Sequence, residues 1–208
     1  MNIHNQTTFG NFSPSQRIHV QAGDALLIVD VQNDFLPGGS LAVPCGDQVV
    51  PVLNHYISLF QDRALPVYAT RDWHPPDHCS FRTQGGPWPP HCIAGSAGAR
   101  FASGLKLPPS ATVISKATSA GTDAYSGFEG TPLDDNLRNA NVQRLFIGGL
   151  ATDYCVLNTV NDALQHGYQV FLLEDAIRAV NVNRNDGVKA EWAMVNQGAI
   201  PVEWKMLS

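Results

Sequence analysis

Cys155 lies in a pattern that could make a thiol reactive. The apolar residues 145–147 have the length and character of a buried strand, small residues follow at 148–152, and Cys155 begins a helical stretch that ends before Gly167. Free backbone N–H groups in the first turn of a helix favour thiolate over thiol and can bind an oxyanion. A lone cysteine is more often a small core side chain, so other residues must decide its role.

Two charged residues have the chemistry that a nucleophilic cysteine needs. Asp30 directly follows the apolar run 25–29, and Lys116 directly follows the run 111–115. A carboxylate can take the thiol proton and later deliver it to a leaving amine, while an ammonium group holds two nearby anions together. Either residue alone could be a helix cap or a solvated edge residue. Together with Cys155 they form a coherent hydrolytic set without a histidine base.

A second group of residues has the composition of a metal site. Asp72 and His74 alternate at the end of an expected strand, so their side chains project to the same side, and His91 follows in an irregular segment. Three protein ligands leave positions open on a metal, as in catalytic sites, although loop histidines without a ligand role are the alternative. The thiols of Cys79 and Cys92 are further candidate zinc ligands in this segment, although nitrogen and oxygen ligands fit the Asp better.

Apolar runs of strand length alternate with helical patterns along the chain. Continuous hydrophobicity suits strands that are covered on both faces, as in a parallel sheet. We therefore expect an α/β fold with a doubly wound, mostly parallel six-stranded sheet and helices on both faces. The expected strands are 25–29, 66–70, 111–115, 145–149, 170–173 and 199–202, and the expected helices are 49–63, 155–166 and 183–197.

The candidate residues follow different strands of this sheet. Asp30, Asp72, Lys116 and Cys155 each come just after a different expected strand. Ligands of open α/β sheets bind beyond the carboxyl ends of the strands, so the four side chains are expected on one rim. The long irregular segment 74–109, rich in Pro, Gly, His and Ser, is expected to be functional.

Composition limits the classes of partner. The net charge of the 208 residues is −5 and only 15% of them are charged, which offers no basic footprint for nucleic acid or an anionic membrane. The first 22 residues lack the apolar core of a signal peptide, and the four cysteines show no C-x-x-C pairing. We expect a cytoplasmic protein with an N-terminal extension at 1–22 and a single domain at 23–208.

Five stretches of the chain, in the right order, resemble those of the nicotinamidases (pyrazinamidases) in the isochorismatase-like superfamily. They are VDVQNDF at 29–35, DWH at 72–74, WPPHC at 88–92, DAYSGF at 123–128 and ATDYCV at 151–156. The resemblance runs from about residue 25 to residue 202. Because five separate motifs occur together, it is far more specific than any one of them.

The resemblance implies a metal-dependent amidase of pyridine nucleotide salvage that converts nicotinamide, and also pyrazinamide, to the acid and ammonia through a cysteine thioester. Cys155 would be the nucleophile, Asp30 the proton carrier and Lys116 the stabilising cation. The implied oxyanion hole consists of the backbone N–H groups of Ala151 and Cys155, beside a cis peptide at Leu150-Ala151. The implied ring-binding residues are Phe35, Trp88 and Tyr125. The implied ligands of one zinc, iron or manganese ion, in a metal-binding loop at 72–110, are Asp72, His74 and His91. The fourth ligand varies in the family, and here His78 or a water held by Ser80 could fill that position.

Other functions on the same sheet are alternatives. An amidase for carbamoyl or ureido substrates would keep the Asp/Lys/Cys set but would not use the metal triplet. A vinyl-ether hydrolase of the isochorismatase type would not need Cys155. A non-catalytic metal-binding or thiol-redox protein would leave Asp30 and Lys116 unexplained. The sequence leaves open the identity of the metal, the preference between nicotinamide and pyrazinamide, and the choice between monomer and homodimer.

Overall fold

Six strands form one parallel sheet in the order β3-β2-β1-β4-β5-β6. This computed structural model describes residues 17–208. It confirms the expected doubly wound α/β fold. The strands are β1 (Asp24–Val29), β2 (Val67–Asp72), β3 (Thr112–Lys116), β4 (Arg144–Leu150), β5 (Gln169–Arg178) and β6 (Ile200–Val202).

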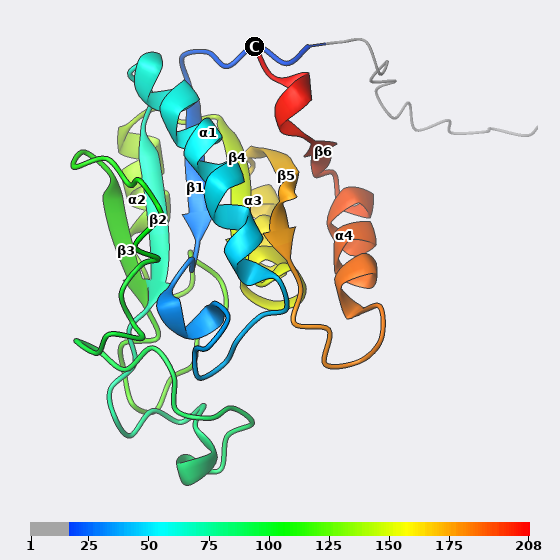
Figure 1. Cartoon of the computed structure of the whole chain (residues 1–208). Helices are drawn as coiled ribbons and strands as arrows, with labels where there is room; N and C mark the ends of the chain where they lie inside the picture. Colours follow the sequence, from blue (N-terminus) through cyan, green and yellow to red (C-terminus); the bar gives the residue numbers. More distant parts are fainter. Residues whose placement is uncertain (1–16) are drawn as a thin grey trace, which may run out of the picture.

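Helices cover both faces of the sheet (Figure 1). Leu26 and Ile28 of β1 belong to the core on the side of α1 (Val49–Asp62), whereas Leu27 and Val29 belong to the core on the opposite side. Both faces are buried, which is why the strands are continuously apolar in sequence. The helices of that opposite side are α2 (Leu133–Asn139), α3 (Leu157–Gln165) and α4 (Asp186–Asn196).

Several elements differ from the expected boundaries. The helix expected at 155–166 is a five-residue π-helix, η4 (Thr152–Val156), followed directly by α3. The helix expected from 183 begins at Asp186. Only two of the seven residues in α2 are buried, and its polar sequence gave no apolar period, so this helix was not predicted.

Strand β5 has ten residues and extends well beyond the run at 170–173 that predicts it. The expected strand ends at residue 173, but the observed strand passes through Glu174 and Asp175 to Arg178. It continues because its second half pairs again with β4 after an irregularity, with Gly149 opposite Ile177. Gly149 has a φ of 129°, and a side chain there would collide with the backbone of Val29. Glycine is therefore required where β1 and β4 approach most closely.

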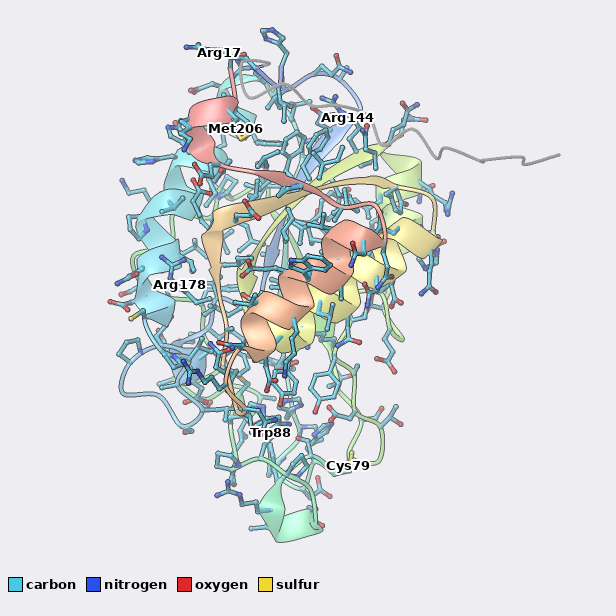
Figure 2. The ribbon with its side chains drawn as sticks, turned by 90° about the vertical axis from the view of Figure 1, so that its right-hand side faces the viewer. Arg17, Cys79, Trp88, Arg144, Arg178 and Met206 are labelled. Carbon is cyan, nitrogen blue, oxygen red and sulfur yellow. The ribbon has the colours of Figure 1, made fainter. Side chains whose placement is uncertain are left out.

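The strand order changes direction between β1 and β4, where open α/β sheets bind their ligands. The long connection from β2 to β3 lies beyond the carboxyl ends of the strands (Figure 1). Trp88 and Cys79, which belong to this connection, lie at the end of the molecule opposite Arg144 and Met206 (Figure 2). None of the helices within 17–208 has the length and apolar character needed to cross a membrane.

The segment 17–22 packs onto the domain. Ile18 and Val20 are buried in the α1-side core, and the Ile18 N–H donates to the Met206 carbonyl at 2.8 Å. These residues of the predicted extension therefore contribute to the domain's core. Residues 1–16 of that extension lie outside the described part of the chain.

Candidate active site

Asp30, Lys116 and Cys155 meet at the carboxyl end of the sheet, as their positions in the sequence predict. The Lys116 Nζ lies 3.1 Å from Asp30 Oδ2 and 3.5 Å from Cys155 Sγ. Asp30 directly follows β1, Lys116 is the last residue of β3 and Cys155 lies in η4. All three side chains are buried, so their charges interact at low effective dielectric.

The neighbouring strands fix these side chains. In the β2–β3 register Asp72 is paired with Lys116, and the Lys116 ammonium donates to Asp72 Oδ1. Lys116 Nζ also donates to the Ala124 carbonyl at 3.0 Å. The Thr70 hydroxyl of β2 donates to Asp30 Oδ1 at 2.7 Å. A lysine inside the protein is thus surrounded by acceptors, which satisfies the requirement for burying a charge.

The buried groups change one another's proton affinity. Burial would lower the pKa of Lys116, but Asp30 and Asp72 reverse this and raise it, so the ammonium stays charged. Burial raises the pKa of Asp30, and Lys116 offsets this only in part. Burial also raises the pKa of Cys155 well above its ordinary value, against the attraction of Lys116. Burial thus opposes the thiolate that the N–H groups at the helix start would favour.

The backbone around the site has unusual conformations. Asp30, Cys92 and Ala117 have φ angles of 49°, 46° and 51°, in the left-handed region that non-glycine residues seldom adopt. Such positions cluster at functional sites, where the surrounding structure enforces them. The Leu150-Ala151 peptide is cis, as the resemblance implies.

Asp72, His74 and His91 come together as a group with the geometry of a metal site. Their candidate ligand atoms all lie within 4.8 Å of one another, and Asp72 Oδ2 is 3.5 Å from His74 Nε2. The His74 Nδ1 donates to the Ala117 carbonyl at 3.2 Å, and the His91 Nδ1 donates to the Pro89 carbonyl at 2.8 Å. Each Nε2 therefore keeps its lone pair, and that of His74 is buried without a hydrogen-bond partner. These residues fit a divalent metal ion.

His78 is not oriented as a fourth ligand. Its Nδ1 lies 2.8 Å from the Ser80 hydroxyl and its Nε2 lies 3.1 Å from the Thr122 carbonyl, so both ring nitrogens have partners. The ring stacks on His74 with 4.1 Å between centroids, which supports the His74 ring instead. Cys92 is buried in the α1-side core, and its thiol is not among the ligand atoms that gather with Asp72, His74 and His91. Ser80 lines the cavity, and a water ligand beside it stays a prediction.

A cavity opens between the metal group and Cys155. Its empty volume is about 460 Å³ when the open solvent at its mouth is included. Phe35, Trp88 and Tyr125, the three expected ring-binding residues, all line it, and Trp88 Nε1 donates to Tyr125 Oη at 2.9 Å. Further lining residues that the sequence did not indicate are Leu41, Val43, Asp123, Tyr154 and Val180.

Of these additional residues, Asp123 and Tyr154 had a signal in the sequence, because they belong to the stretches 123–128 and 151–156 that carry the resemblance. Tyr154 precedes Cys155 in η4, and its ring packs edge-on against Trp88 with 5.2 Å between centroids. Leu41, Val43 and Val180 come from irregular segments without a period, and only the folded chain brings them to the cavity.

The parallel sheet, the buried Asp/Lys/Cys group and the adjoining cavity are those of a cysteine hydrolase whose nucleophile lines the cavity. The family model for the isochorismatase domain matches residues 24–206. The chain therefore belongs to the isochorismatase family.

Two curated relatives cover most of the chain. The nicotinamidase of Escherichia coli (strain K12) is 42% identical over 196 residues, which span 84% of this chain and 92% of that protein. The nicotinamidase/pyrazinamidase of Mycobacterium tuberculosis (strain ATCC 25618 / H37Rv) is 41% identical over 167 residues, which span 76% of this chain and 88% of that protein.

Solved structures agree with this fold. The pyrazinamidase of Pyrococcus horikoshii in complex with zinc superposes with a TM-score of 0.84 at 47% identity, covering 88% of this chain and 99% of that one. PnC1 from L. infantum in complex with nicotinate superposes with a TM-score of 0.85 at 37% identity, covering 92% of this chain and 98% of that one.

Proposed function

We propose that this protein is a metal-dependent nicotinamidase that hydrolyses nicotinamide to nicotinate and ammonia and also accepts pyrazinamide. The observation that carries this proposal is the position of Asp72. Its Oδ1 accepts from Lys116 in the catalytic group, and its Oδ2 faces His74 in the metal group. A nucleophile and a metal site therefore share one cavity, as a substrate with both a carboxamide and a ring nitrogen requires.

The catalytic roles follow from these contacts. Asp30 removes the Cys155 proton, and Sγ attacks the carboxamide carbon to give a tetrahedral oxyanion that the N–H groups of Ala151 and Cys155 stabilise. The carbon–nitrogen bond then breaks, and Asp30 returns the proton to the departing ammonia. The thioester that remains is cleaved by water, whose proton Asp30 accepts and passes back to the thiol. Lys116 keeps the two carboxylates and the developing thiolate together throughout.

The metal group and the aromatic wall would orient the ring. Asp72, His74 and His91 would hold one zinc, iron or manganese ion, which when bound supplies a Lewis acid for the ring nitrogen. Phe35 and Trp88 line the same cavity and would enclose the flat ring between apolar surfaces. A small molecule is therefore the expected partner. A cytoplasmic location and a monomeric or homodimeric state stay predictions.

The other activities considered for this sheet have less support. The Nε2 of His74 is buried and has no hydrogen-bond partner. An amidase for carbamoyl or ureido substrates, or a vinyl-ether hydrolase, would have no metal ion to bind this nitrogen. A non-catalytic protein would have no use for a buried lysine in contact with both Asp30 and Cys155.

Measured ammonia release tests the proposal. Purified protein would be assayed with nicotinamide, pyrazinamide and an N-carbamoyl amino acid, before and after removal of metal with a chelator. We expect hydrolysis of the two ring amides, loss of that activity with the chelator and its return with added zinc, iron or manganese. Turnover of the N-carbamoyl compound alone would overturn the proposal.

A further inference from the structure

The Asp34 carboxylate lies between the metal-ligand loop and the wall of the cavity. Its Oδ2 accepts from the backbone N–H of Cys92 at 2.7 Å, directly next to His91. Its Oδ1 accepts from the backbone N–H of Ser40 at 3.2 Å and from the Ser40 hydroxyl at 3.1 Å. The residue after Ser40 is Leu41, which lines the cavity. One carboxylate is thus bonded to both segments.

The surrounding chain fixes the position of this carboxylate. In the described range 17–208 no ion pair involves Asp34, so the three N–H and O–H donors account for its binding. The Asp34 backbone N–H donates to the Gly98 carbonyl at 3.0 Å, and the Leu41 N–H donates to the Asp34 carbonyl at 3.0 Å. A Cβ added at Gly98 would overlap the Asp34 carboxylate. The backbone therefore leaves room for the carboxylate at this one place.

Two neighbouring side chains each contact only one of the segments. Gln32 is fully buried; its Oε1 accepts from the Asp72 N–H and its Nε2 donates to the Asp72 carbonyl, both at 2.8 Å. Its Nε2 also donates to the Ala99 carbonyl at 3.0 Å, so Gln32 supports the metal group and the segment around Ala99 but does not bond to the wall. Ser40 contacts Asp34 from the wall side, and its N–H and hydroxyl both donate to Asp34 Oδ1 rather than to the metal loop. Asp34 alone among the three is bonded to both sides.

We propose that Asp34 is a positioning residue that couples occupancy of the metal site to the position of the cavity wall at 38–43. A bound ion fixes His91 and so fixes the N–H of Cys92, which holds the carboxylate in the orientation that Ser40 needs. Ser40 in turn sets the position of Leu41 and Val43 against the ring. The identity of that ring rests on the proposed function, but the coupling itself does not.

Three variants separate the two sides of this coupling. Asp34→Asn keeps the shape but offers one acceptor oxygen in place of two, so either Cys92 or Ser40 loses its partner. We expect it to weaken zinc binding about 10- to 100-fold, the usual effect of losing a group that supports a ligand, and also to raise KM for nicotinamide. Gln32→Met should weaken zinc binding and leave KM unchanged at saturating zinc. Ser40→Ala should raise KM and leave zinc affinity unchanged.

Zinc affinity would be measured by titration of chelator-treated protein against a competing indicator, and KM from ammonia release. An Asp34→Asn protein with wild-type zinc affinity, or with weakened zinc binding and an unchanged KM at saturating zinc, would overturn the coupling. A merely structural role would lower the stability of all three variants. It would not separate Gln32→Met, with weakened zinc binding and unchanged KM, from Ser40→Ala, with raised KM and unchanged zinc affinity.

Hydrogen exchange of the wild-type protein gives a test that needs neither substrate nor a variant. Adding zinc to the chelator-treated protein should slow exchange of the Ser40, Leu41 and Val43 amides, and this protection should be lost in Asp34→Asn. Unchanged exchange of these amides in the wild type would overturn the proposal even if Asp34→Asn failed to fold. Because no turnover is measured, failure to hydrolyse nicotinamide would leave this result fully interpretable.

Discussion

The catalytic and metal halves of the site are built by different means. Lys116 belongs to a strand and Asp30 directly follows one, and the sheet register together with the Thr70 hydroxyl sets their positions. His74 and His91 come from the irregular connection after β2, where single hydrogen bonds to backbone carbonyls orient their rings. Only Asp72 belongs to both halves.

The difference predicts how each half responds to change. The catalytic half is a group of buried charges whose loss cannot be compensated by water, so substitutions there should abolish chemistry or cost much stability. The metal half has an open cavity on one side and loop backbone on the other. Substitutions there should mainly weaken binding, in proportion to how directly the side chain faces the ion.

Replacement of the nucleophile has the largest expected effect. Cys155→Ala removes the sulfur that forms the thioester, so we expect nicotinamide hydrolysis to fall by about 10⁴-fold or more with the fold intact. Ammonia release measures the loss, and circular dichroism checks the fold. The matched control is Cys45→Ala, an exposed free cysteine, which should keep wild-type turnover. Residual turnover near the wild-type level in Cys155→Ala would refute the cysteine mechanism.

Loss of the buried Lys116 ammonium group has the second-largest expected effect. Lys116→Met leaves Asp30 and Asp72 buried without their counter-charge, which should cost about 3–5 kcal/mol in the free energy of unfolding, besides eliminating activity. Denaturant titration measures this cost. The control Arg138→Met breaks the exposed pair with Asp134 and should leave the unfolding midpoint unchanged. An equally small effect of both variants would show that the catalytic half is not held by its buried charges.

The same contrast explains how much of the fold could be predicted. The strands and α1 could be predicted from the sequence. Burial of both faces of a strand, or of one face of a helix, leaves an apolar pattern in the sequence. The second half of β5 could not be predicted, because Glu174 and Asp175 resemble the end of a strand. Pairing with β4 extends it, and that pairing exists only in the assembled sheet.

The candidate site shows the same contrast: positions set by strand ends could be predicted from the sequence, and properties set by distant contacts could not. Asp30, Asp72, Lys116 and Cys155 were predictable because strand ends share one rim of a parallel sheet. The state of the thiol was not, since burial of Cys155 depends on residues distant in sequence and outweighs the local helix start. The role of His78 also needed coordinates, because the Thr122 carbonyl that occupies its Nε2 lies 44 positions along the chain.

The raised pKa of Cys155 gives a pH test of the catalytic half. Because burial raises this pKa well above 9.0, the thiol is protonated at pH 7, and the thiolate fraction grows about tenfold per pH unit until the pKa is passed. Labelling of Cys155 by iodoacetamide, followed peptide by peptide by mass spectrometry without substrate, should therefore accelerate steadily between pH 6 and pH 9. A plateau already reached below pH 7 would show a preformed thiolate and reduce Asp30 to a minor role.

The smallest expected effect concerns His78 and decides how far the metal half extends. His78 stacks on His74 but has both nitrogens engaged with Ser80 and Thr122, so it supports a ligand without binding the ion. His78→Asn should weaken zinc affinity by about tenfold or less, the lower end for supporting residues, and keep one zinc per chain. His91→Ala, which removes a direct ligand, should weaken it far more. Equal loss in the two variants would mean that His78 turns to bind the ion and that its hydrogen bonds to Ser80 and Thr122 break when metal is present.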